Sequence, residues 1–187
     1  MIGDVEQADR TIDLGTGVPH ILPKLTIQVA TGVGRGPTKL SAFDSALRAA
    51  GVHNFNLICL SSVVPPQSKV QVLGGPVNPV GDWGDRLYVV MAHERVEGPG
   101  AQAWAGIGWV QEAATGRGLF VEHEGTDEVS VSADIDASLG ALCEGRPQQR
   151  FGPVRKVVRG AVSEDGRPTC ALVVAVFKSE PWHLPRT

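Results

Sequence analysis

The sequence predicts a single domain of the α+β class, a sandwich with two helices and about six or seven strands. Short segments with strand-like alternation recur along the chain, and two longer segments have the three- and four-residue spacing of amphipathic helices. The chain has 187 residues, 42% of them apolar and 20% charged. This length and composition suffice for one well-filled core.

The chain divides into an arm and a domain. Residues 1–24 contain glycine and proline with little periodicity, so we expect a tail or covering arm before a domain that spans residues 25–187. The strand-like segments are 25–30, 55–63, 87–91, 101–110, 118–124, 154–162 and 169–177, and the loop-rich stretch 67–86 contains one further short segment at 70–73. The last two segments are predicted to pair as a hairpin around Glu164-Asp165-Gly166. Residues 32–37 are predicted to form a tight turn, since GVGRGPTK does not fit the phosphate-loop pattern.

Two segments are predicted to be helices. Residues 41–50 place Phe43 and Leu47 on one face, with Ser41 as the cap and Gly51 as the end. Asp44 follows Ser41 by three residues, a spacing that resembles a capping box. The second helix is expected over residues 126–142, with an apolar face formed by Val131, Ile135, Leu139 and Leu142.

Charge and cysteine content exclude several classes of function. A net charge of −3 and a pI near 5.9 argue against nucleic acid or an anionic membrane as a partner. The longest apolar run, residues 171–177, is too short to span a bilayer, and we expect a cytoplasmic protein. Cys59, Cys143 and Cys170 have neither metal-ligand spacing nor a plausible disulfide pattern, so they are interpreted as buried small residues, and no metal site is expected.

The segment NFNLICLSSVVPP, residues 54–66, is the most informative part of the chain. It is a strand-like run that ends in Ser61-Ser62 and is stopped by two prolines, a pattern that needs no chemistry by itself. Paired serines can also be a self-cleavage site. The hydroxyl of the second serine attacks the preceding carbonyl to give an ester, and elimination and hydrolysis then leave a pyruvoyl group at the new N-terminus.

The surrounding residues carry a resemblance to a known family. The block TKLSAFDSALRAAGVHNFNLICLSSVVPP at 38–66, the block PGAQAWAGIGWV at 99–110 and the block GLFVEHEG at 118–125 resemble the pyruvoyl-dependent arginine decarboxylases. The resemblance covers residues 25–177 and implies a four-layer αββα sandwich. It also implies self-cleavage into residues 1–61 and 62–187, with a covalent pyruvoyl cofactor derived from Ser62.

The resemblance also implies roles for three further residues. Asp44 matches the aspartate that receives the substrate guanidinium, and a carboxylate suits that planar donor fork. Asn56 matches the asparagine that supports processing and the working site, as a donor to a developing oxyanion. Glu122 matches the proton donor that restores a proton to the substrate α-carbon, a task for a carboxyl with a raised pKa. Each residue also has a purely structural alternative. Asp44 could cap the helix, Asn56 could be a turn-proximal residue that satisfies backbone groups, and Glu122 could be a solvated strand residue.

The spacing of Asn56 and Ser62 bears on the assembly. Six extended residues span roughly 20 Å, so one straight strand cannot bring the two side chains together. Either the strand bends sharply, or Asn56 of one subunit serves Ser62 of the next. The second arrangement is consistent with the trimer, or dimer of trimers, that the resemblance implies.

The implied reaction is decarboxylation of L-arginine to agmatine through an imine with the pyruvoyl ketone. Three departures from the family pattern leave alternatives open: Ser41 in place of asparagine, Pro99-Gly100-Ala101 in place of Pro-Gly-Glu, and Gly160 where histidine is common. One alternative is the same chemistry on another cationic or guanidino amino acid. The other is an unprocessed relative that binds a ligand or subunits without turnover.

Overall fold

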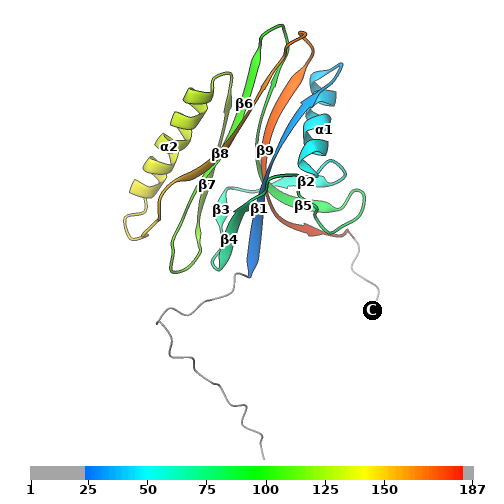
Figure 1. Ribbon diagram of the computed structural model, residues 1–187. Helices are drawn as coiled ribbons and strands as arrows, with labels where there is room; N and C mark the ends of the chain where they lie inside the picture. The colour runs from blue at the N-terminus through cyan, green and yellow to red at the C-terminus, as the bar shows by residue number, and fades with distance from the viewer. Residues whose placement is uncertain (1–23, 183–187) are drawn as a thin grey trace, which may run out of the picture.

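The computed structural model describes residues 24–182, so the predicted arm, apart from Lys24, lies outside the described residues (Figure 1). Nine strands and two helices form within this range. In chain order they are β1 (Leu25–Arg35), α1 (Lys39–Ala50), β2 (Asn56–Cys59), β3 (Val63–Val64), β4 (Ser68–Val72), β5 (Arg86–Val96), β6 (Gln102–Gln111), β7 (Gly118–Gly125), α2 (Glu128–Glu144), β8 (Arg155–Val162) and β9 (Thr169–Glu180). The predicted single α+β domain is confirmed.

Five strands form a mixed sheet in the order β2-β5-β9-β1-β4. The central strand, β9, is antiparallel to both of its neighbours, whereas β4 joins β1 and β2 joins β5 in parallel. Residues 169–177 of β9 are all buried, because other layers cover both faces of the sheet at its centre. This burial on both faces explains the long apolar run in the sequence.

The other four strands form an antiparallel sheet in the order β3-β7-β6-β8. One of its two inner strands, β6, contains Gly106 and Gly108 on the face that meets α2. A Cβ atom at either glycine would lie 2.7 or 2.2 Å from the side chain of Ile135. Small residues in this strand therefore allow close packing of the helix.

The two sheets pack face to face, and one helix covers the outer face of each (Figure 1). The layers run from α1 through the five-stranded and four-stranded sheets to α2, so the predicted four-layer αββα order is present. Three apolar clusters fill the spaces between the layers. They include Ile27, Ile107, Phe120 and Val173 between the sheets, Ala42, Ala46 and Leu172 under α1, and Val131, Ile135 and Leu139 under α2.

The predicted hairpin of the last two strands is wrong. β8 pairs with β6 in one sheet, whereas β9 pairs with β1 and β5 in the other. β9 lies at the centre of its sheet and is buried on both faces, whereas the largely exposed β8 lies at the edge of the other sheet. The turn at Gly166 therefore connects two layers of the sandwich.

The predicted turn at residues 32–37 is also wrong, because β1 continues as a strand to Arg35. The two glycines that suggested a turn lie under α1 instead. A Cβ atom at Gly32 or Gly34 would lie 2.1 Å from a carbonyl oxygen of α1, that of Ala46 or Ala42. Here glycine permits close contact between helix and sheet, with no change in the direction of the chain.

The first helix begins two residues earlier than predicted. Thr38 is the cap, with an extended backbone, and its Oγ1 accepts a hydrogen bond from the Ser41 N–H at 3.1 Å. Ser41 Oγ accepts in return from the Thr38 N–H at 3.0 Å, which completes a capping box. Asp44 therefore has no capping role, and Gly51 ends the helix in the left-handed conformation as expected.

Candidate active site

The predicted cleavage point lies where the chain crosses from one sheet to the other. The sequence predicted one strand over residues 55–63, but β2 and β3 belong to different sheets. The N–H of Leu60 still donates to the Val89 carbonyl in the first sheet at 2.9 Å, whereas the Ser62 carbonyl accepts from Phe120 N–H in the second at 2.7 Å. Ser62 has a φ of +64°, in the left-handed region that is uncommon for residues other than glycine. The amide between Ser61 and Ser62 thus lies at a strained crossing.

Glu122 approaches this crossing from β7. Because Phe120 packs between the sheets, the side chain of Glu122, two residues later, points to the same face. Ser62 Oγ donates a hydrogen bond to Oε1 of Glu122. The intervening His123 points to the opposite face, where its Nε2 lies 2.8 Å from Oγ of Ser138 on α2. The fold therefore joins two of the predicted site residues, which are 60 positions apart in the sequence.

The surroundings of Glu122 favour its protonated form. Burial between the sheets raises the pKa of its carboxyl, and the nearby charge of Glu124 acts weakly in the same direction. The hydrogen bond from Ser62 opposes this shift, because it stabilises the carboxylate. The net effect is a raised pKa, so this carboxyl exchanges a proton more readily near neutral pH than an exposed glutamate does.

Asn56 lies apart from the Ser62 and Glu122 pair. Its Nδ2 donates to the Gly84 carbonyl, and no hydrogen bond joins it to Ser62 within residues 24–182. The chain stays paired with β5 from Asn56 to Leu60, which separates those two residues by about 13 Å at 3.3 Å per residue. The strand thus does not bend sharply before Ser61.

Asp44 lies on α1, which covers the outer face of the five-stranded sheet. Its carboxylate is exposed, and Oδ2 accepts a hydrogen bond from Nη2 of Arg48 at 2.8 Å. Glu122 belongs to the other sheet, so Asp44 takes no part in the Ser62 and Glu122 contact. Within one chain the structure brings together only two of the predicted side chains.

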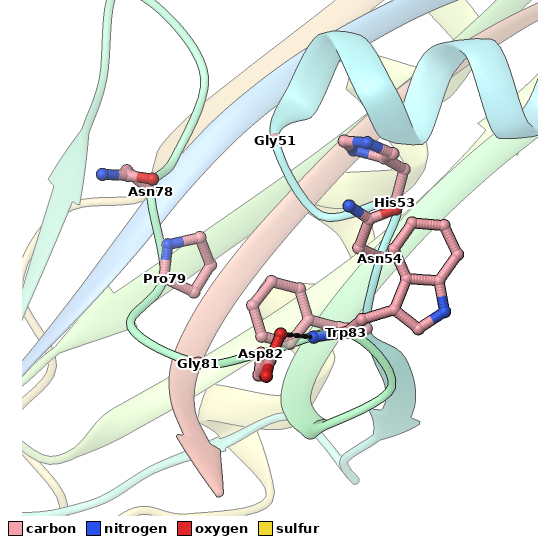
Figure 2. A pocket seen from close by; sticks show the side chains of 9 residues that line it. Gly51, His53, Asn54, Asn78, Pro79, Gly81, Asp82 and Trp83 are labelled. Atoms are coloured by element: carbon pink, nitrogen blue, oxygen red, sulfur yellow. Dashed lines mark hydrogen bonds between the residues drawn. The ribbon is translucent and has the colours of Figure 1, made fainter. Parts of the chain in front are cut away.

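A hollow on the surface adjoins the loop that holds Asn56 (Figure 2). Figure 2 shows His53, Asn54 and Trp83 on one side of it and Asn78 and Pro79 on the other. The loop between the two sides leads to Gly84, whose carbonyl also accepts a hydrogen bond from Trp182 Nε1 at 2.8 Å. Trp83 is 80% exposed. Polar and aromatic side chains therefore line a hollow next to Gly84, whose carbonyl accepts the hydrogen bond of Asn56.

One of the departures from the family pattern, Gly160, has a structural explanation. A Cβ atom at Gly160 would lie 2.5 Å from the Trp104 ring, which packs against the backbone of β8 at this point. A larger residue cannot occupy Gly160 while Trp104 lies there. Ala101 is partly buried against the core between the sheets, and the structure does not explain the absence of a charged side chain there.

Other sequence predictions concern metals, thiols and membranes. Among residues 24–182, no cluster of three or more His, Cys, Asp or Glu side chains could hold a metal ion. The three cysteines are free, but only Cys170 is buried, whereas Cys143 is partly exposed and Cys59 lies exposed in an edge strand. Neither helix in the described range has the length and apolar content needed to cross a membrane.

Sequence reasoning missed three contacts of the site residues. Arg48 follows Asp44 by four positions, a spacing from which their ion pair could have been predicted. The Phe120 N–H and the Gly84 carbonyl are backbone groups brought into place by strand pairing and by a loop. No residue type in the sequence signals such backbone contacts.

Comparison with known proteins places these features in a family. The sequence model of the family described as pyruvoyl-dependent arginine decarboxylase matches residues 26–181. The chain is 33% identical over 153 residues to the pyruvoyl-dependent arginine decarboxylase of Halobacterium salinarum, covering 81% of this chain and 92% of that protein. It is 30% identical over 162 residues to the enzyme of the same name from Pyrococcus horikoshii, covering 84% and 96%. The chain therefore belongs to the pyruvoyl-dependent arginine decarboxylase family.

Proposed function

We propose that this protein cleaves itself between Ser61 and Ser62 and then decarboxylates L-arginine to agmatine and carbon dioxide. The observation that carries the proposal is the contact between Ser62 Oγ and Glu122 at the crossing between the sheets. It places a nucleophile beside a proton acceptor at the one position where the family chemistry requires both.

The geometry at Ser62 supports self-cleavage. The carboxylate of Glu122 accepts the hydroxyl proton while Oγ attacks the carbonyl carbon of Ser61, and the amide nitrogen takes up a proton as its bond to that carbon breaks. The left-handed backbone of Ser62 raises the energy of the uncleaved chain by about 1–3 kcal/mol, and cleavage releases this strain.

The site also suits a pyruvoyl group derived from Ser62. Such a group supplies a ketone that takes the substrate amine and withdraws the electrons left by departing carbon dioxide. Residue 62 would then begin a new chain just before β3, where pairing with β7 holds its backbone. Glu122, already in contact with this side chain, would lie beside the reacting atoms.

Glu122 and Asp44 have separate tasks in this proposal. Glu122 returns a proton to the substrate α-carbon after carbon dioxide leaves, and burial favours the protonated form that this step needs. Asp44 receives the guanidinium of the substrate through charge-assisted hydrogen bonds. These two carboxyl groups belong to different layers of one chain, which favours a site shared between subunits.

We therefore propose a cytoplasmic homo-oligomer, a trimer or a dimer of trimers, in which Asn56 of one subunit serves Ser62 of the next. The extended chain from Asn56 to Leu60 supports this arrangement. Co-expression of Asn56→Ala and Glu122→Gln subunits tests it. Mixed oligomers contain interfaces with both native residues, so they should regain part of the activity that each variant lacks alone. Mixed oligomers without activity would place Asn56 and Ser62 in the same subunit.

Mass spectrometry and a carbon dioxide assay test the main proposal. Mature protein should separate into fragments of 61 and 126 residues (187 − 61), the second with an N-terminal pyruvoyl group in which a keto oxygen replaces the Ser62 amine and a methyl group replaces its hydroxymethyl side chain. Carbon dioxide should form from L-arginine in preference to other amino acids. An intact chain after prolonged incubation would favour the unprocessed relative, and turnover of a different cationic amino acid would correct the substrate.

A further inference from the structure

The proposed anchor for the substrate guanidinium already has a guanidinium partner in its own helix. Nη2 of Arg48 lies 2.8 Å from Oδ2 of Asp44, one helical turn away on the same face of α1. The two side chains are 66% and 51% exposed, so neither is locked in a buried network. In the described residues, Oδ1 of Asp44 has no hydrogen bond.

This pairing affects how a substrate can bind. A guanidinium binds a carboxylate best through two parallel hydrogen bonds, which require both oxygens. Arg48 occupies one of them, so an incoming guanidinium must displace Arg48 or use a single oxygen. An ammonium group is a compact charge that needs only one oxygen, and the same competition affects it less.

We infer that Arg48 is a specificity-determining residue, which competes with the cationic end of the substrate for Asp44. The inference rests on the proposed function, because it assumes that Asp44 receives the substrate. Arg48 weakens the binding of guanidinium compounds to Asp44 more than it weakens the binding of ammonium compounds. It therefore reduces the selectivity of the site for guanidinium ligands. It does not touch the reacting atoms.

The expected effect follows from the strength of the pair. An exposed ion pair at i and i+4 is formed about twice as often as it is broken, so competition alone weakens binding about threefold. Repulsion between Arg48 and the incoming cation adds a factor of about three at the high dielectric of the surface. Removing the charge of Arg48 should therefore tighten binding about three- to tenfold.

A purely structural role for the pair predicts a different result. Arg48 lies in the last turn of α1, where a cation also suits the helix dipole. In that case Arg48→Ala would change stability slightly and leave ligand affinity unchanged. Alanine is a strong helix former, so the variant should fold.

The test uses agmatine, which carries the guanidinium of arginine without its carboxylate. Calorimetry should give a dissociation constant for agmatine at least threefold lower in Arg48→Ala than in the native protein. Arg48→Lys, which keeps the charge, should stay close to the native value. The KM for arginine should fall by the same factor in Arg48→Ala with kcat unchanged, and 0.5 M salt should narrow the difference.

The matched control is Lys156→Ala. Lys156 lies 2.6 Å from Asp136 in an ion pair on the α2 side of the molecule, so its loss removes the same surface charge away from α1. Agmatine binding to Arg48→Ala that is unchanged or weaker would overturn the inference, as would an equal gain in Lys156→Ala. Agmatine binding to neither protein would overturn it as well. Agmatine binding without carbon dioxide release from arginine would instead overturn the proposed reaction and leave the role of Arg48 intact.

Discussion

Replacement of Glu122 by glutamine is the sharpest test of the candidate site. Glutamine has nearly the same shape and still offers a carbonyl oxygen to the Ser62 hydroxyl, so the contact between the two side chains should persist. Only the capacity to accept and return a proton is lost. General acid and base catalysis contributes about 10²- to 10⁴-fold, so both self-cleavage and turnover should slow by that factor. This corresponds to about 2.7–5.4 kcal/mol in the barrier.

The variant should not lose stability, and this separates lost chemistry from lost folding. Burial raises the pKa of Glu122, so the folded state favours the protonated carboxyl. The contribution of Glu122 to stability should therefore be largest below the ordinary pKa of a glutamate, and it should be lost as the pH rises through the raised pKa. Glutamine cannot ionise, so Glu122→Gln should be at least as stable as the native protein at neutral pH.

The assay follows the 61- and 126-residue fragments on denaturing gels over time, with thermal unfolding measured in parallel. In the native protein the cleavage rate should rise with pH through the raised pKa of Glu122, and this dependence should disappear in the variant. Glu124→Gln is the matched control, because Glu124 lies on the same strand and is exposed. Cleavage of Glu122→Gln at the native rate would refute the role of this carboxyl in processing.

Three further predictions follow from the described contacts. Asp44→Asn should raise the KM for arginine at least tenfold, since a charge-assisted hydrogen bond contributes about 1.5–3 kcal/mol, and an unchanged KM would remove Asp44 as the anchor. Gly34→Ala should lower stability by about 1–3 kcal/mol in thermal or denaturant unfolding, because its Cβ would lie 2.1 Å from the Ala42 carbonyl oxygen. Gly74→Ala, where a Cβ meets no atom within 4 Å, should change stability little. The two fragments cut before Ser62 should co-elute in gel filtration, since β1 of the first fragment lies between β4 and β9 of the second, and their separation under native conditions would contradict this pairing.

Much of the fold could be predicted from local patterns. The spacing of Val131, Ile135 and Leu139 placed the apolar face of α2, and all three side chains are buried. Gly51 ended the first helix as expected. These features depend on neighbours in the sequence, so the sequence is sufficient to predict them. The glycines at 32 and 34 were misread, because the same residue serves a turn and a close contact between layers.

The candidate site divides in the same way. The serine pair stood out by its residue types, whereas the resemblance to the decarboxylase family indicated Asn56, Asp44 and Glu122, whose functional groups suit oxyanion donation, guanidinium binding and proton transfer. The tertiary structure decided which of them meet. It broke the predicted strand at the serine pair, placed the two halves in different sheets and brought Glu122 to Ser62 from 60 positions away. It also paired Asp44 with Arg48 and placed Asn56 apart from Ser62 and Glu122. The functional groups of the side chains follow directly from the sequence. Which side chains meet depends on how strands 60 residues apart pair and stack, and no local sequence pattern determines this.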